Sequence, residues 1–188
     1  MDMGVCFAQA WKTLRRHPGP VLGGFLAMEL LSVFSAGLLH GHAIGGLTLI
    51  ARKAEAGGKP KLVDVFNVLD RFVDYILAWL CTLLGVLFCG IGLVLSTFLF
   101  WFAPTVIAVE GEHWKQALGR SMELALRHPG DLTLLITALA ALNLLGLLCL
   151  GIGLVVTWPM TQLITFYAFQ QLSVPVRPAE EHVDIYSS

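Results

Sequence analysis

The sequence is short of charged side chains. Asp, Glu, Lys and Arg make up 13% of its 188 residues, whereas a soluble domain carries about a quarter. The hydrophobic fraction is 56%, more than the core of so short a chain can bury, which indicates that lipid surrounds much of the protein. The net charge is −1, which excludes a nucleic-acid partner held by bulk electrostatics.

Sequence motifs of catalysis and metal binding are also missing. The chain has no nucleophile elbow, no phosphate-binding glycine loop, no HExxH and no pair of catalytic carboxylates. Its four cysteines form no CxxC and show no spacing typical of extracellular disulfides. The sequence therefore predicts that the protein is not an enzyme, with no catalytic residue, no cofactor and no metal motif.

The chain contains long apolar runs. A Gly-Ile-Gly motif that occurs twice separates four of these runs into two pairs. Gly90-Ile91-Gly92 joins the apolar runs of residues 72–89 and 91–109, and Gly151-Ile152-Gly153 joins those of residues 132–150 and 152–170. Glycine adopts turn conformations without steric cost, and each run is close to the length of about 20 residues that crosses the hydrocarbon. Each motif therefore predicts the tip of a transmembrane helical hairpin.

A second repeat predicts a third hairpin. Arg16-His17-Pro18-Gly19 recurs as Arg127-His128-Pro129-Gly130, each time between an amphipathic stretch and an apolar run. Aligned by this repeat, His40-Gly41-His42 falls at the position of the two Gly-Ile-Gly motifs. The apolar run of residues 20–39 precedes this third tip.

The apolar run after the third tip is short. Residues 43–51 cover about half of the hydrocarbon at about 1.5 Å per residue, before Arg52 and Lys53. We expect a helix from about Gly41 to Gly57 that still crosses, with Arg52 and Lys53 reaching the inner headgroups.

Amphipathic stretches precede all three hairpins, at residues 5–17, 62–69 and within 110–131, and they predict helices that lie on the membrane surface. The predicted fold is an all-α polytopic membrane bundle of six transmembrane helices in three hairpins, each preceded by an interfacial amphipathic helix. The predicted units are about 5–57, 62–109 and 113–171, in a single membrane domain of residues 1–172. The polar tail, 173–188, is expected to be disordered and cytoplasmic.

The basic residues orient this bundle. With the three tips on one side, all 12 Lys and Arg residues fall on the opposite side. If the short helix did not cross, most of them would lie outside. The positive-inside rule makes the basic side cytoplasmic, which predicts a multi-pass protein of the bacterial cytoplasmic membrane with both termini in the cytoplasm.

Glu29 is the candidate intramembrane functional residue, because it is the ionisable side chain in the middle of a predicted span. A charge at this depth costs about 2.5–3.5 kcal/mol on insertion scales. Ser32 and Ala36 lie on the same helical face as Glu29, and we expect this face to turn toward the interior of the bundle. One interpretation is an ion or proton relay, which needs a second ionisable group, and only Arg52 or Lys53 folding back could supply one. The other is a hydrogen-bonded side chain that holds helices together.

His40 and His42 are weaker candidates, for metal binding at the external turn. Zinc takes three or four ligands, and no Cys, Asp or Glu stands near these two histidines in the sequence. The alternative interpretation, polar caps for helix ends, is favoured.

Several short motifs spread over residues 5–170 carry a family resemblance: Gly45-Gly46-Leu47, Ala51-Arg52-Lys53-Ala54, Gly58-Lys59-Pro60, Asp64-Val65-Phe66 with Phe72, Gln116-Ala117-Leu118, Ser121-Met122-Glu123-Leu124, His128-Pro129-Gly130, and Gly153, Pro159 and Tyr167. The chain resembles small bacterial membrane proteins of unknown function, grouped with the membrane domain attached to some glycerophosphodiester phosphodiesterases. In that family the phosphodiesterase activity belongs to a separate soluble domain with no counterpart here, so the resemblance implies an architecture and no catalytic residue. Glu29, His40 and His42 are not part of the resembled pattern.

Two functions remain in competition. The first is a non-enzymatic membrane scaffold or accessory subunit, whose interfacial helices present a platform to lipid, to a protein partner or to another copy in a homo-oligomer. The second is a channel or transporter that uses Glu29. A lipid-modifying enzyme has no catalytic constellation behind it.

Overall fold

The computed structural model describes residues 1–35, 37–85, 91–149 and 153–173. Every regular element in these residues is helical, which confirms the predicted all-α class. In chain order they are α1 (Met3–Arg16), η1 (Gly19–Gly23), α2 (Gly24–Phe34), α3 (His40–Glu55), η2 (Leu62–Arg71), α4 (Phe72–Leu83), α5 (Ile91–Leu99), α6 (Ala103–Glu110), α7 (Trp114–Arg127), α8 (Pro129–Leu148) and α9 (Leu154–Ser173). The π-helical η1 leads directly into α2, and η2 is a 3-10 helix.

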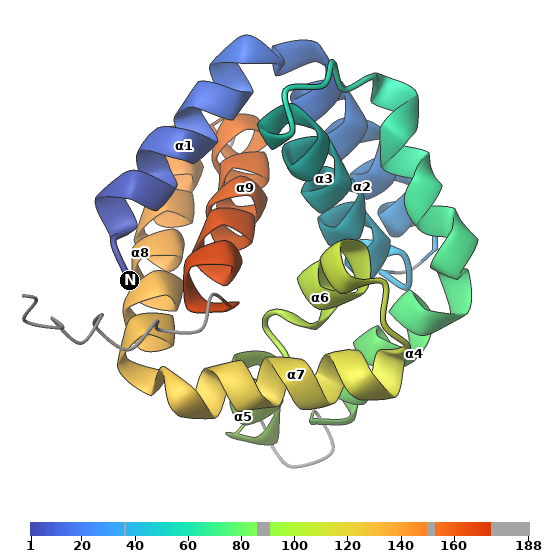
Figure 1. Ribbon diagram of the computed structural model, residues 1–188, viewed down its shortest axis with the longest axis vertical. Helices are drawn as coiled ribbons and strands as arrows, with labels where there is room; N and C mark the ends of the chain where they lie inside the picture. The colour runs from blue at the N-terminus through green and yellow to red at the C-terminus, as the bar shows by residue number, and fades with distance from the viewer. Residues whose placement is uncertain (36, 86–90, 150–152, 174–188) are drawn as a thin grey trace, which may run out of the picture.

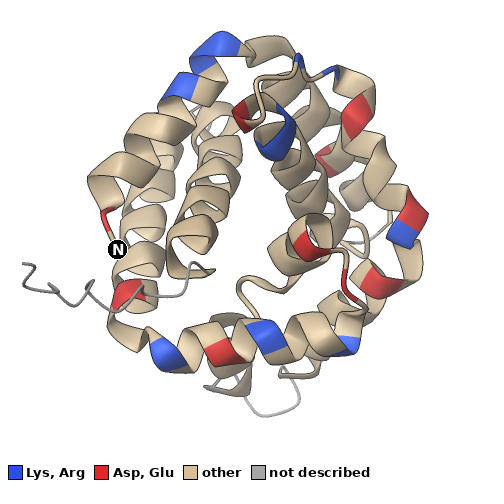
Figure 2. Cartoon of the chain, viewed as in Figure 1, with Lys and Arg blue, Asp and Glu red and all other residues tan. Residues whose placement is uncertain are grey.

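Three helices, α1, η2 and α7, fall where the amphipathic patterns predict them, and we call them the frame. In Figure 1 they run along the edge of the molecule, α1 at the upper left, η2 in light green at the upper right, leading into α4, and α7 at the bottom. Each packs on an apolar helix: α1 on α9, η2 on α3 and α7 on α6. A hydrogen bond of 2.7 Å between Thr13 and Tyr167 ties α1 to α9. The basic residues gather on the frame and on the end of α3 (Figure 2).

The frame helices have three kinds of surface, whereas the sequence predicts only an apolar and a polar face. Phe7, Ala10, Trp11 and Leu14 share the predicted apolar face of α1, but the bundle buries only Ala10 and Leu14. Phe7 and Trp11 stay 46% and 45% exposed. Each frame helix therefore has a buried stripe, an exposed apolar stripe and a charged stripe, because 3.6 residues per turn spread a wide apolar face over two environments.

Glycines allow helices to cross closely, because they have no side chain at the point of contact. A Cβ added to Gly146 would lie 2.3 Å from Thr157 Oγ1, and one added to Gly153 would lie 2.7 Å from the Gly146 Cα. One repeat unit earlier, a Cβ on Gly85 would lie 2.1 Å from Ser96 Oγ and 2.5 Å from the Gly92 carbonyl oxygen. Within the described residues, the two predicted hairpins therefore share one crossing geometry.

The tips themselves need one correction. His40-Gly41-His42 does not form the predicted hairpin tip, because these residues are the first three of helix α3. The chain reverses earlier, where Gly37 has φ 85°, a left-handed conformation that favours glycine. The predicted tip, which came from aligning the repeats, therefore lies a few residues after the observed reversal. The two Gly-Ile-Gly motifs lie largely outside the described residues, as does the tail at 174–188.

Two described helical segments are long and apolar enough to cross a membrane, Gly92–Glu110 and Pro129–Leu148. The apolar segment Gly19–Phe34 is shorter. Pro104 lies at a break in the first of the two long segments, with α5 ending at Leu99 and α6 beginning at Ala103. Pro159, by contrast, lies inside a continuous α9.

Candidate functional site

A cavity of about 480 Å³ lies between α3, α4, α5, α6, α8 and α9. Its size falls within the range of about 300–1,000 Å³ that is usual for small-molecule sites. Four aromatic side chains, Trp79, Phe100, Trp101 and Trp158, contribute to a mostly apolar wall. We regard this cavity as the candidate functional site.

The break between α5 and α6 brings Phe100 and Trp101 to the cavity wall. Pro104 has no backbone N–H and fits the first turn of α6, where no intrahelical donor is needed. The Ser121 hydroxyl of α7 accepts a hydrogen bond from the Phe102 backbone N–H at 3.1 Å and donates one to the Leu99 carbonyl oxygen at 2.9 Å. Backbone groups freed by the break are thus satisfied inside the protein, which is the condition for a broken helix in an apolar medium.

Polar side chains from α8 and α9 line one part of the cavity. Asn143 Nδ2 donates to Thr161 Oγ1 at 2.7 Å and to the Leu139 carbonyl oxygen at 2.9 Å. Among the described residues, three buried atoms of the cavity-lining side chains have no hydrogen-bond partner: Asn143 Oδ1, Trp101 Nε1 and Thr165 Oγ1. Unpaired buried polar atoms are costly, so these three atoms favour a ligand or water molecules that supply the missing hydrogen-bond partners.

The structure brings together two of the residues that the sequence singles out. Glu29 on α2 and His40 on α3 form a pair, with 3.2 Å between Oε1 and Nδ1. Both side chains are mostly buried, with 25% and 18% exposed. His40 also lines the cavity and lies against Trp79, with 5.0 Å between ring centroids.

The pair settles how Glu29 is accommodated. Arg52 and Lys53 do not fold back toward it: Arg52 contacts the Ala108 carbonyl oxygen at 3.4 Å, and Lys53 binds Asp64 at 2.7 Å. The second ionisable group beside Glu29 is instead His40. Ser32, the next residue on the face of Glu29, is buried as predicted, whereas Ala36 lies outside the described residues.

His42 is separated from this pair. Its side chain is fully buried between the rings of Phe72 and Tyr75, at 5.1 and 5.0 Å between centroids. It therefore neither caps a helix end at the surface nor joins His40 in a site. Among the described residues, no group of three or more His, Cys, Asp and Glu side chains lies close enough to hold a metal ion.

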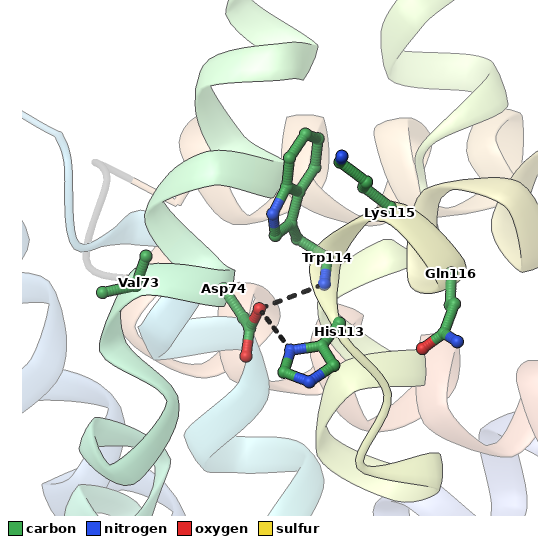
Figure 3. A pocket seen from close by; sticks show the side chains of 6 residues that line it. All are labelled: Val73, Asp74, His113, Trp114, Lys115 and Gln116. Atoms are coloured by element: carbon green, nitrogen blue, oxygen red, sulfur yellow. Dashed lines mark hydrogen bonds and ion pairs between the residues drawn. The ribbon is translucent and has the colours of Figure 1, made fainter.

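A second hollow, of about 570 Å³, lies at the surface where α4 meets α7 (Figure 3). Asp74 Oδ1 accepts a hydrogen bond from the Trp114 backbone N–H at 3.1 Å and lies 3.4 Å from His113 Nδ1. This carboxylate satisfies a free N–H in the first turn of α7. We interpret this hollow as a structural contact between α4 and α7, because the Asp74 carboxylate already binds the N-terminus of α7.

The cavity is the part of the site that sequence reasoning missed. Its walls come from residues between His40 and Thr165, and no repeat or spacing marks them as neighbours. A usable signal was the run of polar residues in the last hairpin, Asn143, Thr161, Gln162 and Thr165, which are too many for a face that meets lipid. No family model, no curated protein and no solved structure matches the chain.

Proposed function

We propose that the chain is a multi-pass integral membrane protein of six spans, in the bacterial cytoplasmic membrane with both termini in the cytoplasm. Support comes from the outer surface of the bundle, where large apolar side chains are exposed. Val33 and Phe34 of α2 are 75% and 81% exposed, and only 22% of the apolar window in α8 is buried. Soluble proteins rarely expose large apolar patches of this kind, whereas lipid covers them without cost.

We further propose that its function is that of a non-enzymatic scaffold or accessory subunit. The observation that supports this proposal most strongly is the exposed surface of the frame. Each of its three helices has an exposed apolar stripe and a charged stripe in addition to the stripe that the bundle buries. On α1 the exposed apolar residues Phe7 and Trp11 adjoin the exposed Lys12, Arg15 and Arg16. This pattern is typical of helices that lie in the headgroup region, and it offers one broad face to lipid, to a protein partner or to a second copy.

Native mass spectrometry of the protein released from nanodiscs tests the scaffold. We expect a defined oligomer, or a chain with retained anionic lipid or a co-purified protein. Replacing Lys12, Arg15 and Arg16 together by Gln should reduce lipid retention, because about 1 kcal/mol of attraction to an anionic surface is lost per basic residue. A control change away from both the frame and the cavity, Thr133 and Thr137 of α8 to Ala, should leave retention unchanged, because both side chains are exposed and neither lines the cavity. A lone monomer that retains nothing would contradict the proposal.

A channel or transporter is the second candidate, and the Glu29–His40 pair favours it. A relay through a membrane usually needs two ionisable groups at depth, and His40 provides the second at the cavity wall. Proton flux into proteoliposomes with an internal pH dye tests this candidate. Glu29→Gln should lower the flux by at least about tenfold, whereas Glu123→Gln on the exposed side of α7 should not. Equal flux in the parent and Glu29→Gln, or no flux in the parent, would eliminate it.

A further inference from the structure

We propose that the cavity between α3, α4, α5, α6, α8 and α9 binds one uncharged, ring-containing amphiphile, with its ring against the tryptophans and a polar head that both donates and accepts hydrogen bonds. This binding site goes beyond the scaffold and does not depend on it. It also does not require transport, since a ligand can occupy the cavity without crossing.

The wall excludes a charged ligand. No Lys, Arg, Asp or Glu is among the described residues that line the cavity. The titratable side chain there is His40, and its Nδ1 already faces Glu29 at 3.2 Å. An ion buried without a counter-charge pays a large desolvation penalty, so a phosphate or carboxylate head does not fit.

The polar head is specified by three unpaired atoms. Trp101 Nε1 can only donate, Asn143 Oδ1 only accepts, and Thr165 Oγ1 does either. Thr165 is 2% exposed, so bulk water does not reach its hydroxyl. Exchanging the two ends of the Asn143 amide would free a donor instead of an acceptor, so one end of this side chain stays available in either orientation.

The ring is specified by the aromatic wall. The aromatic lining comes from three parts of the fold: Trp79 from α4, Trp158 from α9, and Phe100 and Trp101 from the break between α5 and α6. Aromatic side chains favour flat partners through offset and edge-to-face packing. A cavity of about 480 Å³ holds a fused two-ring molecule and is too small for a phospholipid with two chains.

Binding of three related probes to the full chain in nanodiscs tests the proposal, with empty nanodiscs as the blank. The probes are 2-naphthol, which has both ring and head, naphthalene, which has the ring alone, and naphthalene-2-carboxylate, which has a charged head. By equilibrium dialysis we expect 2-naphthol to bind saturably at one site per chain. The other two probes should bind at least about tenfold more weakly, the ratio that a single lost hydrogen bond gives. Equal binding of naphthalene would mean that the cavity recognises only apolar surface, and tighter binding of the carboxylate would contradict the neutral head.

Variants assign the binding to the cavity. Thr165→Val keeps the shape of the side chain and removes its hydroxyl, so it should weaken 2-naphthol by about tenfold and leave naphthalene unchanged. Thr105→Val is the matched control, because Thr105 Oγ1 is also buried and unpaired among the described residues but does not line the cavity. Trp101→Phe removes the indole donor from the lining and gives an independent test if Thr165→Val does not fold. Unchanged 2-naphthol binding in the folded variants would place the bound probe outside the cavity, and no saturable binding by the parent would mean that the cavity does not hold it. Either result would overturn the proposal.

Discussion

Glu29 and His40 join α2 to α3 across the turn between them, with 3.2 Å between Oε1 and Nδ1. The Ser35 hydroxyl supports the same turn: it donates to the Ser32 carbonyl oxygen at 3.0 Å and accepts from the Leu39 backbone N–H at 3.1 Å. The paired side chains therefore close one end of the first hairpin, where apolar packing is limited because Val33 and Phe34 point outward.

The pair should appear as an energetic coupling. In a double-mutant cycle with Glu29→Gln and His40→Gln, we expect an interaction of about 0.5–3 kcal/mol in the free energy of unfolding in micelles, because each single change leaves the other side chain mostly buried without its partner. The same cycle on Glu29→Gln and Glu123→Gln, which are far apart, should be additive to within about 0.5 kcal/mol. Additivity for Glu29 and His40 would show that the contact has no influence on stability.

The glycine crossings should tolerate no methyl group. Gly146→Ala places a Cβ 2.3 Å from Thr157 Oγ1 and 3.2 Å from the Gly153 carbonyl carbon, so the helices of the last hairpin must separate. We expect a loss of about 1–3 kcal/mol in unfolding free energy. Gly119→Ala in α7 is the control: a Cβ there meets nothing within 4 Å, and alanine should stabilise this helix by about 0.4–1 kcal/mol. Equal effects of the two changes would mean that the crossing is looser than the structure shows.

Several features of the fold could be predicted because they depend on local pattern. The periodicity and length of the apolar and amphipathic stretches predicted helices at α1, η2 and α7, and the structure has helices there. The tip at His40-Gly41-His42 was wrong because a repeat aligns positions and does not determine backbone conformation. Gly37, a few residues earlier, has the positive φ at which the chain reverses between α2 and α3.

The site could be predicted only in part. Glu29 was identified by its depth in an apolar run, but its partner His40 was assigned to a different role, because the contact depends on where the turn lies. The cavity was not foreseen, since Trp101 reaches it only through the break that Ser121 of α7 supports. A contact between helices that are distant in the sequence produces no periodic pattern of residues from which it could be predicted.

The junction between α3 and η2 should depend on acid pH. Asp64 Oδ2 accepts hydrogen bonds from Lys53 Nζ at 2.7 Å and from the Lys61 backbone N–H at 2.6 Å. These donors, Lys53 first, hold the pKa of Asp64 below its usual 3.8. Because the pKa is lowered in the folded state, the stabilisation is fully present above the usual pKa and is lost as the pH falls through the folded-state pKa.

Unfolding of the parent and of Asp64→Asn between pH 6 and pH 2 measures this dependence. At pH 6 we expect the parent to be more stable by about 0.5–2 kcal/mol, the range of a helix cap with an exposed ion pair. The difference should shrink below pH 4. Lys53→Met should reduce the pH dependence, since it removes the largest cause of the shift. A difference that stays constant down to pH 2 would assign the effect to packing instead.

The two ends of α3 should lie on opposite sides of the membrane. His42 is unsuitable for a labelling test, because its side chain is fully buried and would be protected from either side. Leu38 in the turn before α3 is 41% exposed, and Lys59 in the loop after α3 is also exposed. In a chain without its native cysteines, Leu38→Cys should react with an impermeant maleimide added to intact cells, and Lys59→Cys only after the membrane is opened. Reaction of both positions from the same side would mean that α3, with its 16 residues, does not cross, and most basic residues would then lie outside, against the positive-inside rule.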